Sequence, residues 1–188
     1  MKPTANPHRR PWRGTLLAMV LAIALPCAGG ASAQALTEAQ LRARFLINFL
    51  RFTEFPANAF PGAGAPLGLC VLGAGDPFEG ALAEVQGATV GGHKVAVRSH
   101  VEAEQAADCQ LLYVPDGELR RLAAARDAIG RHPVLIVGES EAVLDRGGMI
   151  ALRDADRHLA FVVSLSPARH AALSFSPQML HAAATVLP

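Results

Sequence analysis

Cys70 and Cys109 are the two residues of this chain whose type and setting favour a covalent bond. The sequence of 188 residues has three cysteines, and the third, Cys27, lies in an N-terminal segment with the features of a signal peptide. The remaining two lie in strand-like apolar runs, 67–72 and 109–114, which could neighbour each other. An even number of cysteines in an exported chain is best interpreted as a disulfide. Two free buried thiols and a redox-active pair are the alternatives that the residues leave open.

Gly73 and Gly75 follow an apolar run in the order that opens a dinucleotide-binding fingerprint. The third glycine of that fingerprint allows close packing of helix on strand, and Phe78 occupies its position. A tight turn is therefore the favoured interpretation, and we expect no nucleotide cofactor.

Histidines, serines and paired carboxylates are the other residue types that could support catalysis or hold a metal. No two mature histidines have the i, i+4 or short-loop spacing of a metal site, and no serine lies in a Gly-x-Ser-x-Gly elbow. Two carboxylate pairs lie beside glycines or in a predicted turn: Glu139 with Glu141, and Asp154 with Asp156. Solvated loop residues are the default there, although sequence does not exclude a hydrolase pair. We expect no enzyme activity and no metal site.

The first 33 residues have the order of a secretory signal peptide. Four basic residues without an acid precede an apolar run from Leu16 to Leu25, which is too short to span a membrane. Small residues follow, and we place cleavage after Ala33. Lipid attachment at Cys27 is the alternative, and Pro26 directly before it disfavours it. We therefore expect a periplasmic mature chain.

Removal of the signal peptide changes the formal net charge from +1 to −3, because 13 basic and 16 acidic residues remain. A mildly acidic chain without basic clusters has no electrostatic basis for binding nucleic acid. The remaining residues, 34–188, suit one domain with a core of its own.

An aromatic-rich helix is predicted over residues 37–55. Phe45, Phe49 and Phe52 recur at helical spacing, a capping-box pair begins the segment, and Pro56 should set its end. The apolar face of this helix is broader than a surface helix needs. Part of it is therefore expected to contact something other than the core of the same chain.

Alternating strands and helices follow this first helix. Apolar runs and turn residues predict strands at 67–72, 94–99, 111–114, 133–137, 149–152 and 159–165, and helices at 76–86, 118–130 and from Ser176 onward. This pattern predicts an α/β fold, a Rossmann-like layered sandwich with about six strands in a mixed sheet flanked by helices. The last two strands are expected to form an antiparallel pair.

A small secreted α/β domain with surplus aromatic surface and no catalytic set is most naturally a binding module. We expect its partner or dimer surface at the end of the first helix, with aromatic contacts and a charged rim. The residues expected there are Phe49, Arg51, Phe52, Glu54 and Phe55. The last helix and the strand at 159–165 form a second possible docking surface.

Several short motifs occur along the chain in a specific order. They are Phe-Thr-Glu-Phe-Pro at 52–56, Leu69–Gly73, Asp76-Pro-Phe at 76–78, Asp108–Val114, Pro133–Val137 and Gly147–Ile150. Because these motifs occur in this order, the chain resembles the YfiR family of small periplasmic proteins over residues 37–187. Phe55 stands where the usual form of the first motif has Trp.

The resemblance implies a role in cyclic-di-GMP signalling. In YfiR-like systems the periplasmic protein binds the sensory domain of an inner-membrane diguanylate cyclase and holds it inactive, and an outer-membrane lipoprotein can sequester the repressor. The resemblance thus implies a homodimeric repressor that lowers cyclic-di-GMP and biofilm formation. Cys70 and Cys109 match a cysteine pair typical of the family. A second pair present in some relatives is missing, because its region has Asp145 and Leu152.

Two other functions remain open from the sequence. The chain could be a small-molecule sensor that binds a ligand in an α/β crevice and signals through a membrane partner. It could also be a secreted hydrolase, for which a buried Asp/His/Ser cluster would be needed.

Overall fold

The computed structural model describes residues 36–155 and 158–188. The predicted signal peptide (1–33), Cys27 and Asp156 lie outside the described residues. The strands of the main sheet are β2 (Leu67–Leu72), β3 (Thr89–Val90), β4 (His93–Val101), β5 (Leu111–Val114), β6 (Leu135–Gly138), β7 (Ile150–Ala155), β8 (His158–Ser164) and β10 (Thr185–Leu187). A separate two-stranded ladder joins β1 (Thr53–Glu54) to β9 (Ser174–Phe175).

The helices are α1 (Glu38–Phe52), α2 (Leu122–Ile129), α3 (Leu165–His170) and α4 (Pro177–Ala182). Short 3₁₀ segments connect them to the strands: η1 (Ala57–Ala59), η2 (Ala81–Val85), η3 (Ala103–Asp108), η4 (Asp116–Glu118) and η5 (Glu141–Arg146).

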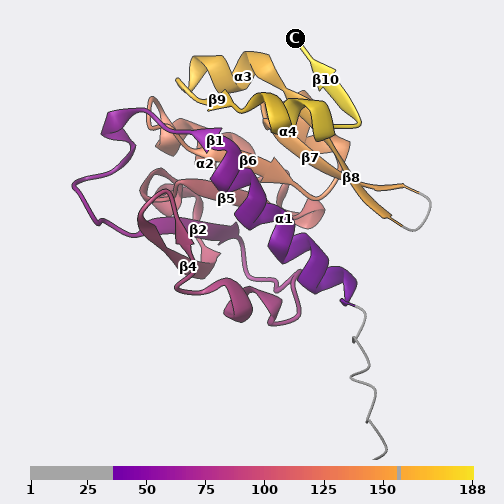
Figure 1. Cartoon of the computed structure of the whole chain (residues 1–188), viewed down its shortest axis with the longest axis horizontal. Helices are drawn as coiled ribbons and strands as arrows, with labels where there is room; N and C mark the ends of the chain where they lie inside the picture. The colour runs from indigo at the N-terminus through magenta and orange to yellow at the C-terminus, as the bar shows by residue number, and fades with distance from the viewer. Residues whose placement is uncertain (1–35, 156–157) are drawn as a thin grey trace, which may run out of the picture. The chain divides into compact units, whose positions relative to one another are not determined.

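The main sheet has eight strands in the order β10-β8-β7-β6-β5-β2-β4-β3 (Figure 1). Strands β4, β2, β5, β6 and β7 pair in parallel, β7 and β8 are antiparallel, and β10 returns parallel to β8. The predicted mixed α/β sandwich is confirmed. The six predicted strands correspond to β2, β4, β5, β6, β7 and β8, and the short β3 and β10 were not predicted.

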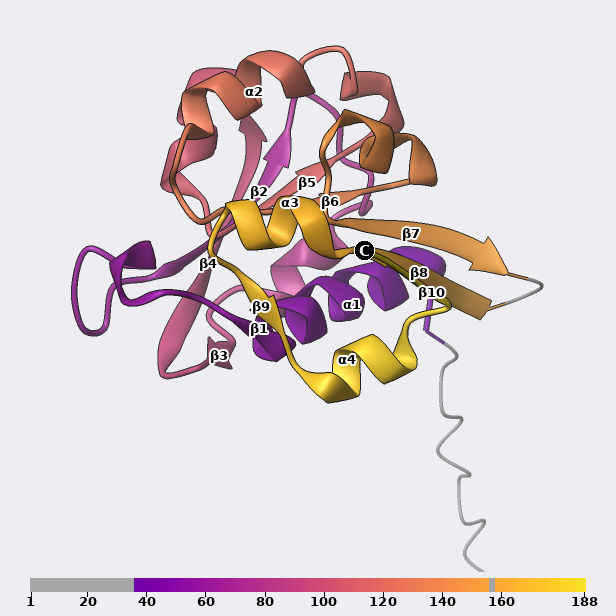
Figure 2. The ribbon, with the colours of Figure 1, turned by 90° about the horizontal axis from the view of Figure 1, so that it is seen from above.

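Two apolar layers cover the two faces of the sheet, because successive strand residues point to opposite sides. Along β5, Leu111 and Tyr113 pack with α1, whereas Leu112 and Val114 pack with α2. Figure 2 shows α1 and α4 on one side of the sheet and α2 on the other. All six residues of β2 are buried, as expected of a central strand covered on both faces.

The start of α1 follows the predicted capping box. Thr37 accepts a hydrogen bond from the Gln40 backbone N–H (3.2 Å), and the Gln40 side chain accepts one from the Thr37 N–H (3.0 Å). Two of the N–H groups that a helix start leaves unpaired are thereby satisfied.

The end of α1 comes at Phe52, three residues before the predicted end at 55. Thr53 and Glu54 leave the helix and pair with Phe175 and Ser174 in the β1–β9 ladder. The non-local partner strand supplies the hydrogen bonds that a further helical turn would have made. Pro56 is therefore not what stops this helix.

The predicted helix at 76–86 is wrong. The Asp76 carboxylate accepts hydrogen bonds from the Phe78 and Gly80 N–H groups (3.1 and 2.8 Å), and Gly80 has a left-handed φ of 83°. The side chain thus holds the backbone in a turn, and only the 3₁₀ segment η2 follows. The predicted helix at 118–130 is likewise shorter, since α2 begins at Leu122.

Candidate functional site

An apolar groove of about 680 Å³ lies between α1, β8 and α4. Its aromatic and aliphatic walls come from three separate parts of the chain: Phe45, Phe49 and Phe52 on α1, Leu159 and Phe161 on β8, and Met179 on α4. Asn48, His158 and Gln178 add polar groups to the lining. A concave apolar site with a few polar groups has the composition of a recognition pocket.

Three phenylalanines pack against one another in the wall of this groove. Phe49 contacts Phe161 with ring centroids 5.0 Å apart, and Phe45 lies 5.8 Å from Phe49 and 6.1 Å from Phe161, all edge-to-face. Edge-to-face pairs add to the stabilisation that burial provides. The aromatic wall of the groove is therefore continuous with the hydrophobic core.

Phe49 and Phe52, both predicted at a partner surface, take different positions. Phe49 is only 2 % exposed and belongs to the core, so it forms the floor of the groove and not a free surface. Phe52 is partly buried and lines the groove, where a bound group could touch it. The helical periodicity placed both residues on one apolar face but did not tell the inner residue from the outer one.

Arg51 and Glu54 are both exposed near the end of α1. Arg51 donates to the Asn48 side-chain oxygen (3.4 Å), and the Glu54 carboxylate accepts from the Ser174 hydroxyl (2.9 Å). Glu54 is thus tied to β9, an element that lies far from it in sequence.

Phe55 joins a second aromatic cluster. Its ring packs edge-to-face on Phe60 (6.0 Å), which stacks on His93 at 3.8 Å. The five predicted surface residues therefore divide among the core, the groove, the exposed surface and this second cluster. Conversely, the groove unites two docking surfaces that the sequence suggested separately. One is the first helix, and the other is formed by the strand at 159–165 together with the last helix.

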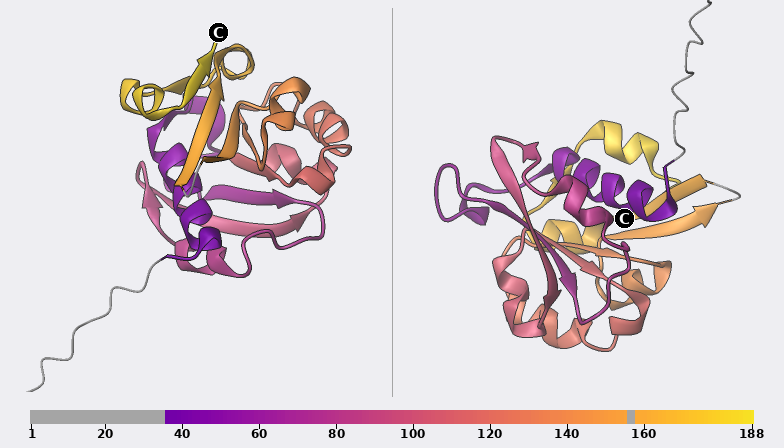
Figure 3. Two further views of the ribbon diagram at one scale, coloured as in Figure 1. Left: turned by 90° about the vertical axis from the view of Figure 1, so that its right-hand side faces the viewer. Right: turned by 90° about the horizontal axis from the view of Figure 1, so that it is seen from below.

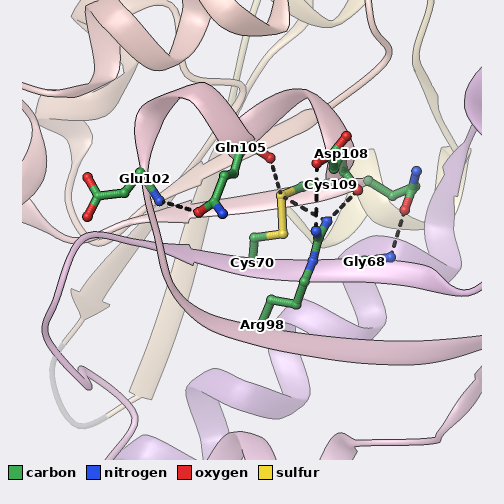
Figure 4. Close-up of polar contacts among 8 residues, drawn as sticks. Gly68, Cys70, Arg98, Glu102, Gln105, Asp108 and Cys109 are labelled. Atoms are coloured by element: carbon green, nitrogen blue, oxygen red, sulfur yellow. Dashed lines mark hydrogen bonds and ion pairs between the residues drawn. A yellow bond between two sulfur atoms is a disulfide. The ribbon is translucent and has the colours of Figure 1, made fainter.

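The predicted disulfide between Cys70 and Cys109 is present in the structure (Figure 4), with a Cα–Cα distance of 6.0 Å. It joins β2 to the residue that follows η3, and both cysteines are essentially buried, at 0 and 1 % exposure. Arg98 lies over it, donating to the Asp108 carbonyl (2.5 Å) with the same nitrogen 3.7 Å from the Cys109 sulfur. The bond therefore lies inside the α2-side layer, away from the groove.

A polar cluster lies beyond the carboxyl ends of β5 and β6. Arg42 on α1 pairs with Glu38 and lies 3.7 Å from carboxylate oxygens of both Glu139 and Asp154. Glu139 and Asp154 were predicted to be solvated loop residues. Asp154 is solvated, with its side chain 74 % exposed, but it lies in β7, whereas the Glu139 side chain after β6 is 30 % exposed. Both carboxylates lie within ion-pair distance of Arg42 on α1. The contacts of Arg42 with Glu139 and Asp154 could not be predicted from the sequence, because the three residues lie far apart in the chain.

Tyr113 is buried beside this cluster, at 0 % exposure. Among the described residues, its hydroxyl and the Arg42 Nε have no hydrogen-bond partner. Burial, and after it the negative charge of Glu139, raises the pKa of the Tyr113 phenol far above its usual value. The nearby Arg42 acts in the opposite direction.

Within residues 36–155 and 158–188, no group of three or more His, Cys, Asp or Glu side chains is arranged to hold a metal ion. In the same part of the chain, no helix has both the length and the apolar character needed to cross a membrane.

Together, these features define a disulfide-bonded α/β domain with an aromatic-lined groove. The chain belongs to the YfiR/HmsC-like family, whose model matches residues 39–184. The resemblance found in the sequence is thereby confirmed. This family comprises periplasmic regulators of diguanylate cyclase signalling and is not a known enzyme family.

One solved structure supports the fold. A conserved domain protein from Vibrio cholerae O1 biovar El Tor N16961 has a TM-score of 0.51 at 11 % identity, covering 81 % of this chain and 61 % of that protein. The chain thus spans about three fifths of that protein's length. A Streptococcus pneumoniae ABC domain in complex with L-Trp has a TM-score of 0.45 at 11 % identity, covering 64 % and 55 %, and this is too low to support an argument. None of the curated proteins compared with the chain matches it.

Proposed function

We propose that this protein is a periplasmic repressor that binds the periplasmic domain of an inner-membrane diguanylate cyclase and thereby lowers cyclic-di-GMP and biofilm formation. In this proposal the mature chain is one domain, 34–188, exported by the signal peptide at 1–33, and it acts as a homodimer. An outer-membrane lipoprotein that captures the repressor would release the cyclase.

The observation that carries the proposal is the groove between α1, β8 and α4, together with the family membership. Phe52 and Leu159 line the groove without being fully buried, and Asn48 and Gln178 add hydrogen-bonding groups to it. Aromatic side chains in a concave site are the typical anchors of protein–protein contacts. We assign the cyclase contact to this groove, with Arg51 and Glu54 as its charged rim.

Repression by this contact requires differential binding. A bound protein shifts a cyclase toward its inactive state only by the difference between its affinities for the two states. A groove with a closely packed aromatic wall suits this task, because it would favour a cyclase conformation that presents a complementary side chain. About 1.4 kcal/mol of difference would change the ratio of the two states tenfold.

The test is cellular cyclic-di-GMP in a strain that lacks the gene, compared with its parent and with complemented strains. We expect the deletion to raise cyclic-di-GMP and the wild-type gene to reverse the rise. Complementation with Phe52→Ala should fail, whereas Phe60→Ala should succeed. Phe60 is the matched control, since it is also a partly buried phenylalanine but lies outside the groove.

Folding is checked separately, because Phe52 contributes to the core. The thermal midpoint and the periplasmic level of each variant are measured beside its activity, and Phe52→Leu tests whether apolar bulk alone is sufficient. An unchanged cyclic-di-GMP level after deletion, in a strain whose cyclase is active, would contradict the repressor function. A folded Phe52→Ala variant that represses normally would contradict the assignment to the groove.

A second candidate function is the sensing of a small molecule through a membrane signalling partner. The volume of the groove, about 680 Å³, is within the range of small-molecule pockets. A ligand in this groove should raise the melting temperature of the wild-type protein, because binding to the folded state alone stabilises it. The rise should shrink for Phe52→Ala and remain for Phe60→Ala.

A further inference from the structure

Strand β10 forms one edge of the main sheet. Among the residues that the structure describes, it pairs with β8 alone, with Thr185, Val186 and Leu187 beside Val162, Val163 and Ser164. The hydrogen-bonding groups on its outer side therefore face away from the sheet. Figure 3 shows this strand, in yellow, at the margin of the domain.

The side chains of β10 are unusual for an open edge. All three residues are exposed, and Val186 and Leu187 keep 39 and 38 % of their surface accessible. Within the described chain they are two of three exposed large hydrophobic residues, the other being Leu36 at 42 %. Soluble proteins normally protect an edge with charges, prolines, bulges or very short strands. Strand β10 is short, at three residues, but none of them is charged or a proline.

The opposite edge of the sheet is protected in these ways. Strand β3 has only two residues and is joined to β4 by Gly91 and Gly92, both with left-handed φ angles. Lys94 on β4 lies beside Thr89 in the ladder and is exposed. Both edge strands are short, so the two edges differ in charge and in the two apolar side chains that β10 leaves exposed.

The charge distribution indicates a second copy as the partner. In a twofold contact a residue on the axis lies opposite its own symmetry mate, so a charged side chain close to the axis meets a like charge. Residues 182–188, from the end of α4 through β10, contain no charged side chain and no histidine. The end of α1, in contrast, carries Arg51 and Glu54 and suits a partner with complementary charges.

We propose that two copies of this chain associate by antiparallel pairing of their β10 strands about a twofold axis at Val186, which joins the two sheets into one. Val186 then lies opposite its own copy, and Thr185 lies opposite the Leu187 of the other chain. The proposal rests on the homodimer of the proposed function and deepens it by naming the surface. The contact borders the groove, because Ala184, which directly precedes β10, also lines the groove.

The size of the contact sets its expected strength. A ladder of three residues on each side is a small interface, even with Ala183 and Ala184 beside it, and interfaces below about 1,200 Å² are typically weak and transient. We therefore expect a reversible dimer with a dissociation constant on the order of 10 μM.

The first test is sedimentation of the purified mature chain over about 1 to 300 μM, a range that brackets the expected constant. The wild type should change from monomer to dimer. Val186→Lys, which places two ammonium groups at the axis, should weaken the dimer at least about tenfold. Leu36→Lys is the matched control, because it introduces the same charge at a similarly exposed apolar residue outside the β10 edge. This variant should dimerise as the wild type does. A wild type that stays monomeric at the highest concentration, or a Val186→Lys variant that dimerises normally, overturns the proposal.

A second test locates the axis. Val186→Cys should form an intermolecular disulfide across the axis under mild oxidation, visible on a non-reducing gel. Leu36→Cys should not. Efficient cross-linking only through Leu36→Cys would place the contact elsewhere and overturn the proposal. Both tests use the purified chain without a cyclase, so failure of this dimer and failure of the repressor function are separately visible.

Discussion

At the scale of single residues, Tyr113 is the best internal probe of this protein. It is the only tyrosine in the chain, and the only tryptophan, Trp12, lies in the predicted signal peptide. The Tyr113 ring packs edge-to-face on the buried Phe78 with centroids 4.7 Å apart. An optical signal from tyrosine in the mature protein therefore reports on one buried position at the carboxyl end of β5.

The raised pKa of Tyr113 predicts a loss of stability at alkaline pH. The usual pKa of the phenol is 10.0, and burial holds the folded-state pKa far above it. Above pH 10 the unfolded chain therefore releases a proton that the folded chain keeps, which favours unfolding. The stability associated with this group is complete below pH 10 and falls as the pH rises beyond it. In absorbance at 295 nm, phenolate should appear only together with the loss of far-UV circular dichroism.

Tyr113→Phe is the control for this titration. Because the hydroxyl has no partner among the described residues, its removal should leave stability at pH 7 unchanged or raise it by up to about 1 kcal/mol. The variant should also lose less stability than wild type between pH 10 and 11. Phenolate that forms in the wild type near pH 10, while the circular dichroism is still native, would show that Tyr113 is accessible and would contradict the prediction.

At the scale of elements, the α1 capping box is both a sequence signal and an observed contact. Thr37→Ala removes the acceptor for the Gln40 N–H and should lower the free energy of unfolding by about 1 kcal/mol, as measured by urea denaturation. Thr89→Ala on β3 is the matched control, an exposed threonine outside any helix start. Equal effects of the two substitutions would mean that the cap contributes nothing specific.

The elements that could be predicted from sequence are those that local patterns define. The run 67–72 became β2 and the run 111–114 became β5 with the same bounds, since each is apolar throughout and followed by turn residues. Ser176 begins α4 as predicted, because a serine followed by proline forms an N-cap that requires no distant partner.

The elements that could not be predicted depend on distant partners. β1 exists only through its pairing with β9, and β10 only through β8. The same limit applies to the site. Phe52 was found from its helical spacing, but the opposite wall of the groove, Phe161 and Met179, comes from segments more than 100 residues away. Periodicity also could not show that Phe49 lies beneath the groove, since both faces of an apolar stripe look alike in sequence.

At the scale of the whole molecule, the groove, the polar cluster and the β10 edge all involve the main sheet. The disulfide links β2, a central strand of this sheet, to the residue that follows η3. The bond closes a segment with a sequence separation of 39 residues, which runs from β2 through η2, β3 and β4 to the end of η3. In the chain-entropy model such a loop corresponds to about 4 kcal/mol of stabilisation of the folded state. A domain of this size has a total stability on the order of 10 kcal/mol, so the bond is a large part of it.

Burial of this disulfide predicts how it responds to a reductant. Cys70 and Cys109 are exposed by 0 and 1 %, and η3 and Arg98 cover the sulfur atoms, so a thiolate reaches them only after the domain opens. In excess dithiothreitol we expect the rate of reduction to become independent of reductant concentration and equal to the global unfolding rate, rising with urea. Thr37→Ala should raise the rate of reduction if α1 unfolds together with the rest of the domain. The double variant Cys70→Ser/Cys109→Ser, which lacks the bond, should have a free energy of unfolding about 4 kcal/mol lower than that of the wild type. Mass spectrometry of alkylated samples measures the reduction, and stopped-flow circular dichroism measures the unfolding. A reduction rate that stays proportional to dithiothreitol at zero urea would show a local opening around η3 instead, and the bond would then report on that element and not on the stability of the whole domain.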